Sequence, residues 1–357
     1  MQYGMFIMPF HDPGKPLAQC YDEDLELVVL AEELGFSEFW IGEHHTMKYE
    51  NIASPEIFIG KALAMTKHIR LGPAPICVQQ HHPAHVAGRL AFLDHLSHGR
   101  LNVCLGPGSV TADQEYFGVD PKLSAVMVEE AVEMILHLWT QPPPYHLEGK
   151  FWQIHLEQYV DSETLIGYPH QPYQKPYPPM FIPAASPNSP SMKGAGRRGW
   201  APMSSNLVAG NVVADHWRTY ETAALEAGRT PDRNDWRVCR SIFIAETNKE
   251  AEQAVRTNSL GKNFNYIGNL FDKGLGRKMF KRDPNQSNAD TNLDYLMQEQ
   301  IIHGDPNEVI RRLRLLMEET GPFGTLVLLG YDWDDKAAWL RSMNLFVNEV
   351  MPALNRG

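Results

Sequence analysis

The residues best suited to chemistry form a short polar cluster, Glu43-His44-His45, directly after the apolar run 39–42. An imidazole with an ordinary pKa of about 6.5 can give or take a proton at neutral pH. A buried parallel strand that ends in polar residues presents them at the rim of an α/β barrel. We therefore expect His44 to be available for proton transfer, with a purely structural histidine as the alternative. Glu43 could orient this ring, although adjacent strand residues point to opposite faces.

A second group of histidines, at positions 81, 82 and 85, raises the question of a metal site. His81 and His85 have the spacing of ligands on one helical face. Pro83, however, is expected to begin the helix, so the pair straddles the helix start and loses that geometry. No carboxylate or cysteine follows in register, and we predict that the chain binds no metal.

These groups must be positioned by strands and helices, which alternate in the sequence. Apolar runs predict eight strands, each followed by a helical pattern, and this order favours a (β/α)₈ TIM barrel in one domain over residues 1–357. A doubly wound open sheet is the alternative. Long insertions are expected after strand four (142–179) and after strand seven (260–291), the second as a lid or a disordered segment. The predicted strands are 3–8, 39–42, 70–78, 100–105, 180–184, 201–203, 237–245 and 324–329.

The composition and net charge of the chain argue against some classes of binding partner. The chain has 357 residues, is 43% hydrophobic, and carries 32 Lys+Arg against 43 Asp+Glu, for a net charge of -11. This balance argues against nucleic acid and against an anionic membrane surface. No apolar run approaches the roughly 18 residues of a membrane span, and no signal peptide is indicated. Four scattered cysteines predict reduced thiols in a cytoplasmic protein.

Two loops have the composition of ligand-binding segments. Gly106-Pro107-Gly108 follows the fourth strand, but it lacks the third glycine of a dinucleotide fingerprint, and Pro107 has no amide to offer a pyrophosphate. Ser186 and Ser189 lie where the fifth strand leads into a helix, so hydroxyls and free amides gather at a positive helix end. That arrangement is suited to a phosphate.

Several motifs together resemble one known family. They are Glu43-His44-His45, the run from Pro75 to Pro83, Gly99-Arg100, and the segment 106–118. In this order and spacing they resemble the bacterial luciferase-like flavin monooxygenases, and the similarity extends over about residues 2–329. The resemblance implies a (β/α)₈ barrel that holds reduced FMN at the C-terminal rim, where the flavin reacts with oxygen to give a C4a-peroxyflavin.

The resemblance also implies roles for individual residues. His44 stands where the family has its catalytic acid/base. The flavin ring would rest against a cis peptide bulge, here at Ala74-Pro75, where proline lowers the cost of the cis form to about 0.5–1 kcal/mol. Gly106 would let the backbone approach the flavin ring closely. Luciferase itself has a cysteine at this place, so the resemblance does not support light emission. The residues that would hold the FMN phosphate are Ser186, Asn188 and Ser189.

The substrate pocket is predicted from residues that follow barrel strands. Phe10 and His11 come after the first strand and Met203 ends the sixth. The apolar and aromatic composition of these segments favours a hydrophobic substrate, such as a terpenoid, ketone, aldehyde or alkane-like molecule.

The predicted function is therefore the oxygenase component of a two-component flavin monooxygenase. It would receive reduced FMN from a separate NAD(P)H:flavin reductase, activate O₂ and oxygenate a hydrophobic small molecule. By resemblance we also expect a homodimer. Two alternatives stay open: an F420-dependent hydride-transfer enzyme on the same barrel, and a non-catalytic flavin-binding subunit.

Overall fold

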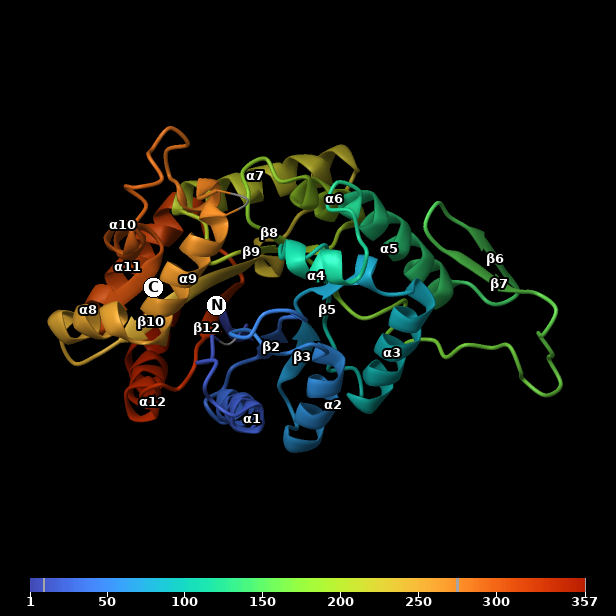
Figure 1. Cartoon of the computed structure of the whole chain (residues 1–357), viewed down its shortest axis with the longest axis horizontal. Coiled ribbons are helices and arrows are strands. Elements are labelled where there is room, and N and C mark those ends of the chain that lie inside the picture. Colours follow the sequence, from blue (N-terminus) through green and yellow to red (C-terminus); the bar gives the residue numbers. More distant parts are fainter. Residues whose placement is uncertain (9, 274–275, 357) are drawn as a thin grey trace. The chain divides into compact units, whose positions relative to one another are not determined.

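Strands and helices alternate along most of the chain (Figure 1). The computed structural model describes residues 1–8, 10–273 and 276–356. Their order is β1 Gln2–Ile7, α1 Leu17–Glu33, β2 Glu38–Ile41, α2 Pro55–Met65, β3 Arg70–Pro73, β4 Ile76–Cys77, α3 Pro83–Leu96, β5 Val103–Gly106, α4 Thr111–Tyr116, α5 Ser124–Thr140, β6 Tyr145–Glu148, β7 Gln153–Leu156, β8 Met180–Ala184, α6 Pro190–Arg198, β9 Ala201–Ser204, α7 Gly210–Glu226, β10 Arg237–Ile244, α8 Asn248–Thr257, α9 Ser259–Asp272, α10 Leu293–Glu299, β11 Ile301–Gly304, α11 Pro306–Thr320, β12 Thr325–Gly330, α12 Lys336–Leu345 and α13 Met351–Asn355.

The chain divides into two units by its internal contacts. The first unit comprises Met1–Glu38, Lys48–Glu50 and Ile182–Gly357. In it β1 pairs with β12, β12 with β10, and β10 with both β9 and β11, all in parallel. The strands are apolar and buried along nearly their whole length, as expected where helices cover a parallel sheet.

The second unit comprises Phe39–Met47 and Asn51–Phe181. Its parallel pairs join β4 to β5 and β5 to β8. The single strand predicted over 70–78 is wrong, because the structure has two short strands, β3 and β4, with a cis peptide bond at Ala74–Pro75 between them. Proline has no amide hydrogen to continue a strand ladder.

Prolines, capping side chains and glycine mark several helix ends. α3 begins at Pro83, as predicted, and α6 begins at Pro190. Asp305 caps α11, since its side chain accepts a hydrogen bond from the Glu308 amide at 2.9 Å. Gly35 follows α1 with φ of 83°, the left-handed conformation that suits glycine at a helix end.

The two predicted insertions contain more regular structure than expected. Segment 142–179 includes the antiparallel hairpin β6–β7, which Figure 1 shows beyond α5 in the second unit. Most of the first half of segment 260–291 is helix α9, whose Leu260, Phe264 and Phe271 are buried on one face. Polar residues between these apolar positions concealed the helical period in the sequence. Residues 274–275 of the expected lid lie outside the described residues.

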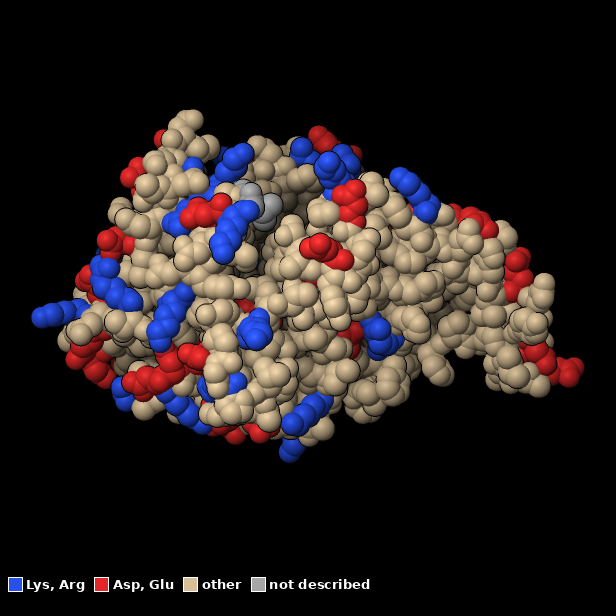
Figure 2. Space-filling model, in the orientation of Figure 1, with Lys and Arg blue, Asp and Glu red and all other residues tan. Residues whose placement is uncertain are grey.

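A further parallel strand, β11, was missed because it is only four residues long and follows directly after α10. On the face shown in Figure 2, Lys and Arg side chains are interspersed with Asp and Glu. Over residues 1–8, 10–273 and 276–356, no helix combines the length and the apolar character needed to cross a bilayer.

Candidate active site

His44 lies against a carboxylate that comes from a helix after a different strand. Nδ1 of His44, which follows β2, is 3.1 Å from Oδ2 of Asp113 in α4. The other oxygen, Oδ1, accepts hydrogen bonds from the amides of His45 at 3.2 Å and Thr46 at 2.7 Å. It also accepts one from the Thr46 hydroxyl at 2.6 Å. Asp113 thus fixes the backbone after β2 and the ring of His44 at the same time.

The charge state of this pair follows from its surroundings. Burial raises the pKa of Asp113, but the hydrogen bonds from His44 and Thr46 outweigh that effect and lower it to about 2. Asp113 is therefore a carboxylate at neutral pH and accepts a hydrogen bond from Nδ1 of His44. With that tautomer, any proton exchange by this imidazole would have to take place at Nε2. Sequence reasoning missed Asp113, since the only signal was an acidic residue within the segment 106–118.

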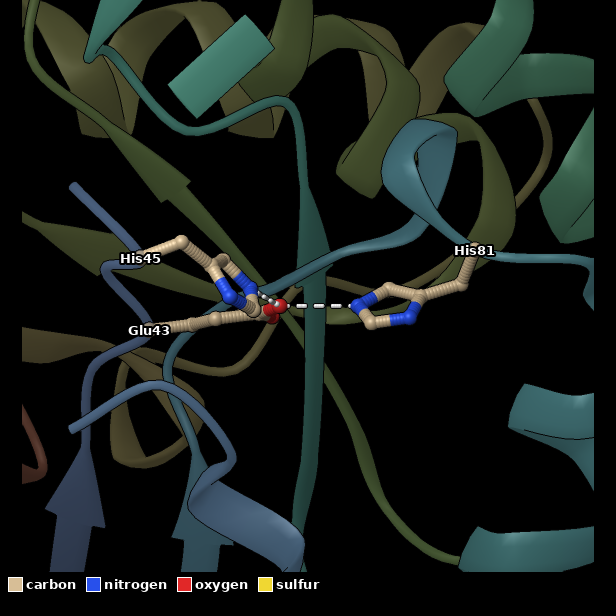
Figure 3. A group of neighbouring side chains, drawn as sticks. All are labelled: Glu43, His45 and His81. Carbon is tan, nitrogen blue, oxygen red and sulfur yellow. Dashed lines mark hydrogen bonds and ion pairs between the residues drawn. The ribbon is translucent and has the colours of Figure 1, made fainter. Parts of the chain in front are cut away.

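Glu43 organises a second group, shown in Figure 3. Oε1 of Glu43 lies 2.9 Å from Nε2 of His45 and 2.7 Å from Nε2 of His81, while Oε2 accepts a hydrogen bond from the Cys77 amide at 2.8 Å. Burial raises the pKa of Glu43, but these hydrogen bonds lower it to about 2. Glu43 therefore stays ionised and ties the end of β2 to the end of β4.

Glu43 and His44 follow β2, which ends at Ile41, and their side chains have different partners. Glu43 contacts His45 and His81, whereas His44 contacts Asp113. The sequence argument that adjacent residues would not pair directly is consistent with the hydrogen bonds of Glu43.

The group in Figure 3 also has the composition of a metal site. The ligand atoms of Glu43, His45 and His81 all lie within 4.8 Å of one another. The search along the sequence found no third ligand because His81 approaches from the segment after β4. The carboxylate is nevertheless saturated by hydrogen bonds, and the guanidinium of Arg89 lies 3.4 Å from Nδ1 of His81. The positive charge of Arg89 beside Nδ1 of His81 disfavours the binding of a metal cation there. That this group binds no metal stays a prediction.

The segment after β5 lies close to the cis bulge. Cys77 pairs with Gly106 in the register of β4 and β5. Gly108 has φ of 63°, and a Cβ atom there would lie 2.7 Å from Sγ of Cys77. The loop therefore requires glycine for both conformation and space.

Two buried amide oxygens next to this loop have no partner. The side-chain amides of Gln79 and Gln114 both donate to the carbonyl of Pro107. Their Oε1 atoms are buried and have no hydrogen-bond partner among the described residues. Buried acceptors of this kind need a donor, and the ring N–H of a flavin is one. These residues, which the sequence analysis missed, fit the predicted ring position at Ala74, Pro75 and Gly106.

The predicted phosphate-binding residues lie in the first unit, at the start of α6. The Ser189 side chain precedes the helix without capping it, so its hydroxyl is not used for that purpose. The backbone N–H of Asn188 donates to Oδ2 of Asp215 at 2.6 Å, so this donor is engaged within the protein and a carboxylate lies beside it. Ser186 and Ser189 fit an anion better than Asn188 does.

Another missed residue supports this loop. The ring of His216, in α7, is within 3.0 Å of the Ser186 carbonyl through Nε2 and of the Ser204 hydroxyl through Nδ1. Burial lowers the pKa of His216 to about 4, so the ring is neutral. It joins the loop after β8 to the end of β9.

The predicted substrate residues differ in their surroundings. Phe10 stacks on Tyr49 at 4.5 Å between ring centroids and lines a cavity of about 440 Å³ in the first unit. His11 is only 1% exposed and contacts Asp332 at 2.6 Å and Asp24 at 3.2 Å. Met203 is buried in β9. Of the three, Phe10 has the position of a pocket residue.

Comparison with known proteins decides the family. The family model described as luciferase-like monooxygenase matches residues 1–322. The chain belongs to this family. The expected relationship and the expected enzyme class, a flavin-dependent monooxygenase, are therefore confirmed.

Relatives and a solved structure agree with this membership. Limonene 1,2-monooxygenase of Rhodococcus erythropolis is 32% identical, over 99% of this chain and 87% of that protein. The oxygenase component of a flavin-dependent trigonelline monooxygenase from Acinetobacter baylyi is 27% identical, over 99% and 96%. The oxygenating constituent of 3,6-diketocamphane monooxygenase from Pseudomonas putida, solved in complex with FMN, superposes with a TM-score of 0.88 at 29% identity, covering 99% of this chain and 98% of that one.

These matches bear on two further predictions. The predicted TIM-barrel class of this luciferase-like monooxygenase is confirmed, and so is FMN as the expected cofactor. Similar structures below 25% identity include F420-dependent enzymes and show the fold alone.

Proposed function

We propose that this luciferase-like monooxygenase is the oxygenase component of a two-component system that oxygenates a hydrophobic small molecule. The observation that carries the proposal is the buried His44–Asp113 pair at the end of β2. It supplies a proton donor and acceptor whose ring orientation is set by Asp113. The same unit contains the cis bulge and two buried amide oxygens that have no hydrogen-bond partner within the described part of the chain.

The proposed reaction needs two electrons and two protons for each O₂. When bound, reduced FMN supplies the electrons; one oxygen atom enters the substrate and the other leaves as water. The chain's own residues orient the ring and move protons. His44 exchanges a proton at Nε2, while Asp113 holds Nδ1 and stabilises the imidazolium form. Oε1 of Gln79 and of Gln114 would be available to accept a hydrogen bond from the ring N–H.

Reduced flavin would come from a separate reductase. The chain is similar to a protein that is named as an oxygenase component, and it shows no dinucleotide fingerprint after β5. We expect the reductase to be needed only as a source of reduced FMN, so that chemically reduced FMN replaces it. A homodimer is part of the same proposal.

The substrate class we propose is a cyclic terpenoid ketone or alkene. Relatives named for diketocamphane and limonene support this class. The aromatic side chains of Phe10, Tyr49 and Tyr266 line the cavity in the first unit together with polar and charged residues, and aromatic side chains suit an apolar ring.

Rapid mixing tests the proposal. The protein with chemically reduced FMN is mixed with oxygenated buffer, with and without camphor-type ketones or limonene, and flavin absorbance, O₂ consumption and products are followed. We expect substrate-dependent consumption of one O₂ per oxygenated product. Release of all the oxygen as hydrogen peroxide with every substrate would contradict the proposal.

The F420 alternative gives a different result in the same experiment. Hydride transfer between F420 and an alcohol or ketone would proceed without O₂ and would change the absorbance of F420. Activity of that kind, together with no oxygenation in the presence of reduced FMN, would replace the proposed reaction. A non-catalytic flavin-binding subunit would bind FMN and give neither signal.

A further inference from the structure

The β6–β7 hairpin carries a cluster of potential metal ligands that the monooxygenase reaction does not use. His146, Glu148 and His155 each offer a ligand atom, and these atoms all lie within 4.8 Å of one another. Glu157 follows β7 on the same side, with Oε2 3.0 Å from Nδ1 of His146. All four side chains lie on the solvent face of the hairpin, and each is about half exposed.

The strand register places the two imidazoles opposite each other. His146 pairs directly with His155 across the antiparallel strands, and residues in such pairs have Cβ atoms about 4.5–5.5 Å apart. The rings stack with centroids 4.5 Å apart and an angle of 9° between their planes. Oε1 of Glu148 lies 2.7 Å from Nε2 of His155 and 3.7 Å from Nε2 of His146.

These distances suit a small divalent ion. Zn²⁺ bonds to imidazole nitrogen and carboxylate oxygen at about 2.0–2.2 Å, so tetrahedral ligand atoms stand about 3.4 Å apart. The two distances from Oε1 of Glu148 bracket that value. The imidazole planes are nearly parallel, so both rings must rotate about their side-chain bonds for their nitrogen lone pairs to point at one ion. Two carboxylates also give the cluster a negative charge when both imidazoles are neutral, and a divalent cation would neutralise it.

The hairpin is held in a fixed position before any ion binds. The carboxylate of Glu130, in α5, accepts hydrogen bonds from the amides of Lys150 at 2.8 Å, Phe151 at 2.8 Å and Trp152 at 3.0 Å. These three residues form the turn between β6 and β7. Because the turn is fixed, the register that pairs the histidines is fixed too, and the backbone that carries the ligands is preorganised.

We propose that His146, His155 and Glu148 form a binding site for one divalent transition-metal ion of the Zn²⁺ or Cu²⁺ class, with Glu157 as a supporting carboxylate. Nitrogen-rich sites bind Cu²⁺ more tightly than Zn²⁺. The bound ion links β6 to β7, and its remaining coordination position faces solvent.

Calorimetric titration of the full chain without an affinity tag, using ZnCl₂ in a non-chelating buffer, tests the site. We expect one Zn²⁺ per chain, and His146→Gln or His155→Gln should weaken binding by more than the roughly 10–100-fold that loss of an outer-shell partner costs. His85→Gln is the matched control, since His85 is an exposed histidine outside the cluster. It should leave the affinity unchanged.

Two further measurements locate the ion. Hydrogen exchange of the amides in 145–156 should slow on adding Zn²⁺, and the electron paramagnetic resonance of bound Cu²⁺ should show two nitrogen ligands. Zn²⁺ binding that is lost in His81→Gln and kept in His155→Gln would overturn the proposal and assign the ion to the group of Figure 3. Absence of Zn²⁺ and Cu²⁺ binding would overturn it as well, leaving the cluster as ion pairs. None of these readouts depends on flavin or on oxygenation.

Discussion

At the scale of single residues, the proposed reaction gives His44 and Asp113 different roles in proton transfer. The imidazole would exchange the proton, while the carboxylate contacts the ring and the backbone amides beside it. Asp113 accepts hydrogen bonds through both oxygens, so loss of its charge would disturb several partners at once.

Replacement of His44 by alanine separates catalysis from cofactor binding. We expect His44→Ala to bind reduced FMN with nearly unchanged affinity and to form product about 10²–10⁴-fold more slowly, the usual contribution of a positioned acid/base. Anaerobic titration gives the affinity and single-turnover mixing gives the rate. His82→Ala, at an exposed position, is the control. Product formation at the wild-type rate in His44→Ala would refute the assigned role.

Asp113→Asn tests the positioning role. We expect a rate at least about tenfold lower and a pH–rate profile displaced to lower pH, because an imidazolium at position 44 loses its carboxylate partner. Asp113→Glu should recover part of the rate. Glu115→Gln removes an exposed carboxylate from the same helix and should change neither quantity. A lower rate with an unmoved pH profile would mean that Asp113 only supports the fold.

At the scale of elements, the loop after β5 depends on one glycine. Gly108 and Gly118 both have positive φ, of 63° and 69°, but only a Cβ at Gly108 meets another atom, Sγ of Cys77. We expect Gly118→Ala to lower the free energy of unfolding by about 1–2 kcal/mol. Gly108→Ala should lower it further, because the contact adds to the backbone cost. Urea denaturation measures both, and equal losses would show that the loop accommodates the methyl group.

Elements with strong end signals could be predicted from the sequence, and those without could not. Pro83 begins α3, as predicted from its sequence, and Pro190 begins α6 in the same way. The hairpin β6–β7 was missed because its strands have four residues each and lie between proline-rich segments. Residues 70–78 form one apolar run that predicts a single strand, and the break at Pro75 divides it.

The candidate site could be predicted only where a local sequence pattern marks a residue. Glu43 and His44 follow directly after an apolar run, so local pattern finds them. The partner of His44 is 69 residues away in the sequence, and the two glutamines matter only because their amides meet one carbonyl group. Tertiary packing brings these residues into contact, and the local periodicity of the sequence does not predict such contacts.

At the scale of the whole molecule, His11 joins the two ends of the first unit. It follows β1, and its partner Asp332 follows β12, 321 residues later. Asp24 of α1 completes the buried group. Burial would lower the pKa of His11, but the hydrogen bonds to Asp24 and Asp332 outweigh it and raise the pKa to about 9.

This arrangement predicts how stability depends on pH. The ordinary pKa of histidine is 6.5 and that of folded His11 is about 9, so the stabilisation is complete below pH 6.5 and is lost as the pH rises through 9. The free energy of unfolding should fall across this window by at most about 1.4 kcal/mol per pH unit. Urea denaturation at several pH values measures it. His11→Gln should remove this slope, while His85→Gln should keep it; an unchanged slope in His11→Gln would assign the effect to other groups.

The separate partners of two adjacent residues have a consequence for how this barrel can diversify. His44, the proposed reacting group, contacts Asp113, whereas Glu43 contacts His45, His81 and the Cys77 amide. A substitution at position 44 would leave these hydrogen bonds of Glu43 in place. A descendant of this protein could therefore change its chemistry at position 44 while Glu43 still joins the end of β2 to the end of β4, and selection could act on the two residues separately.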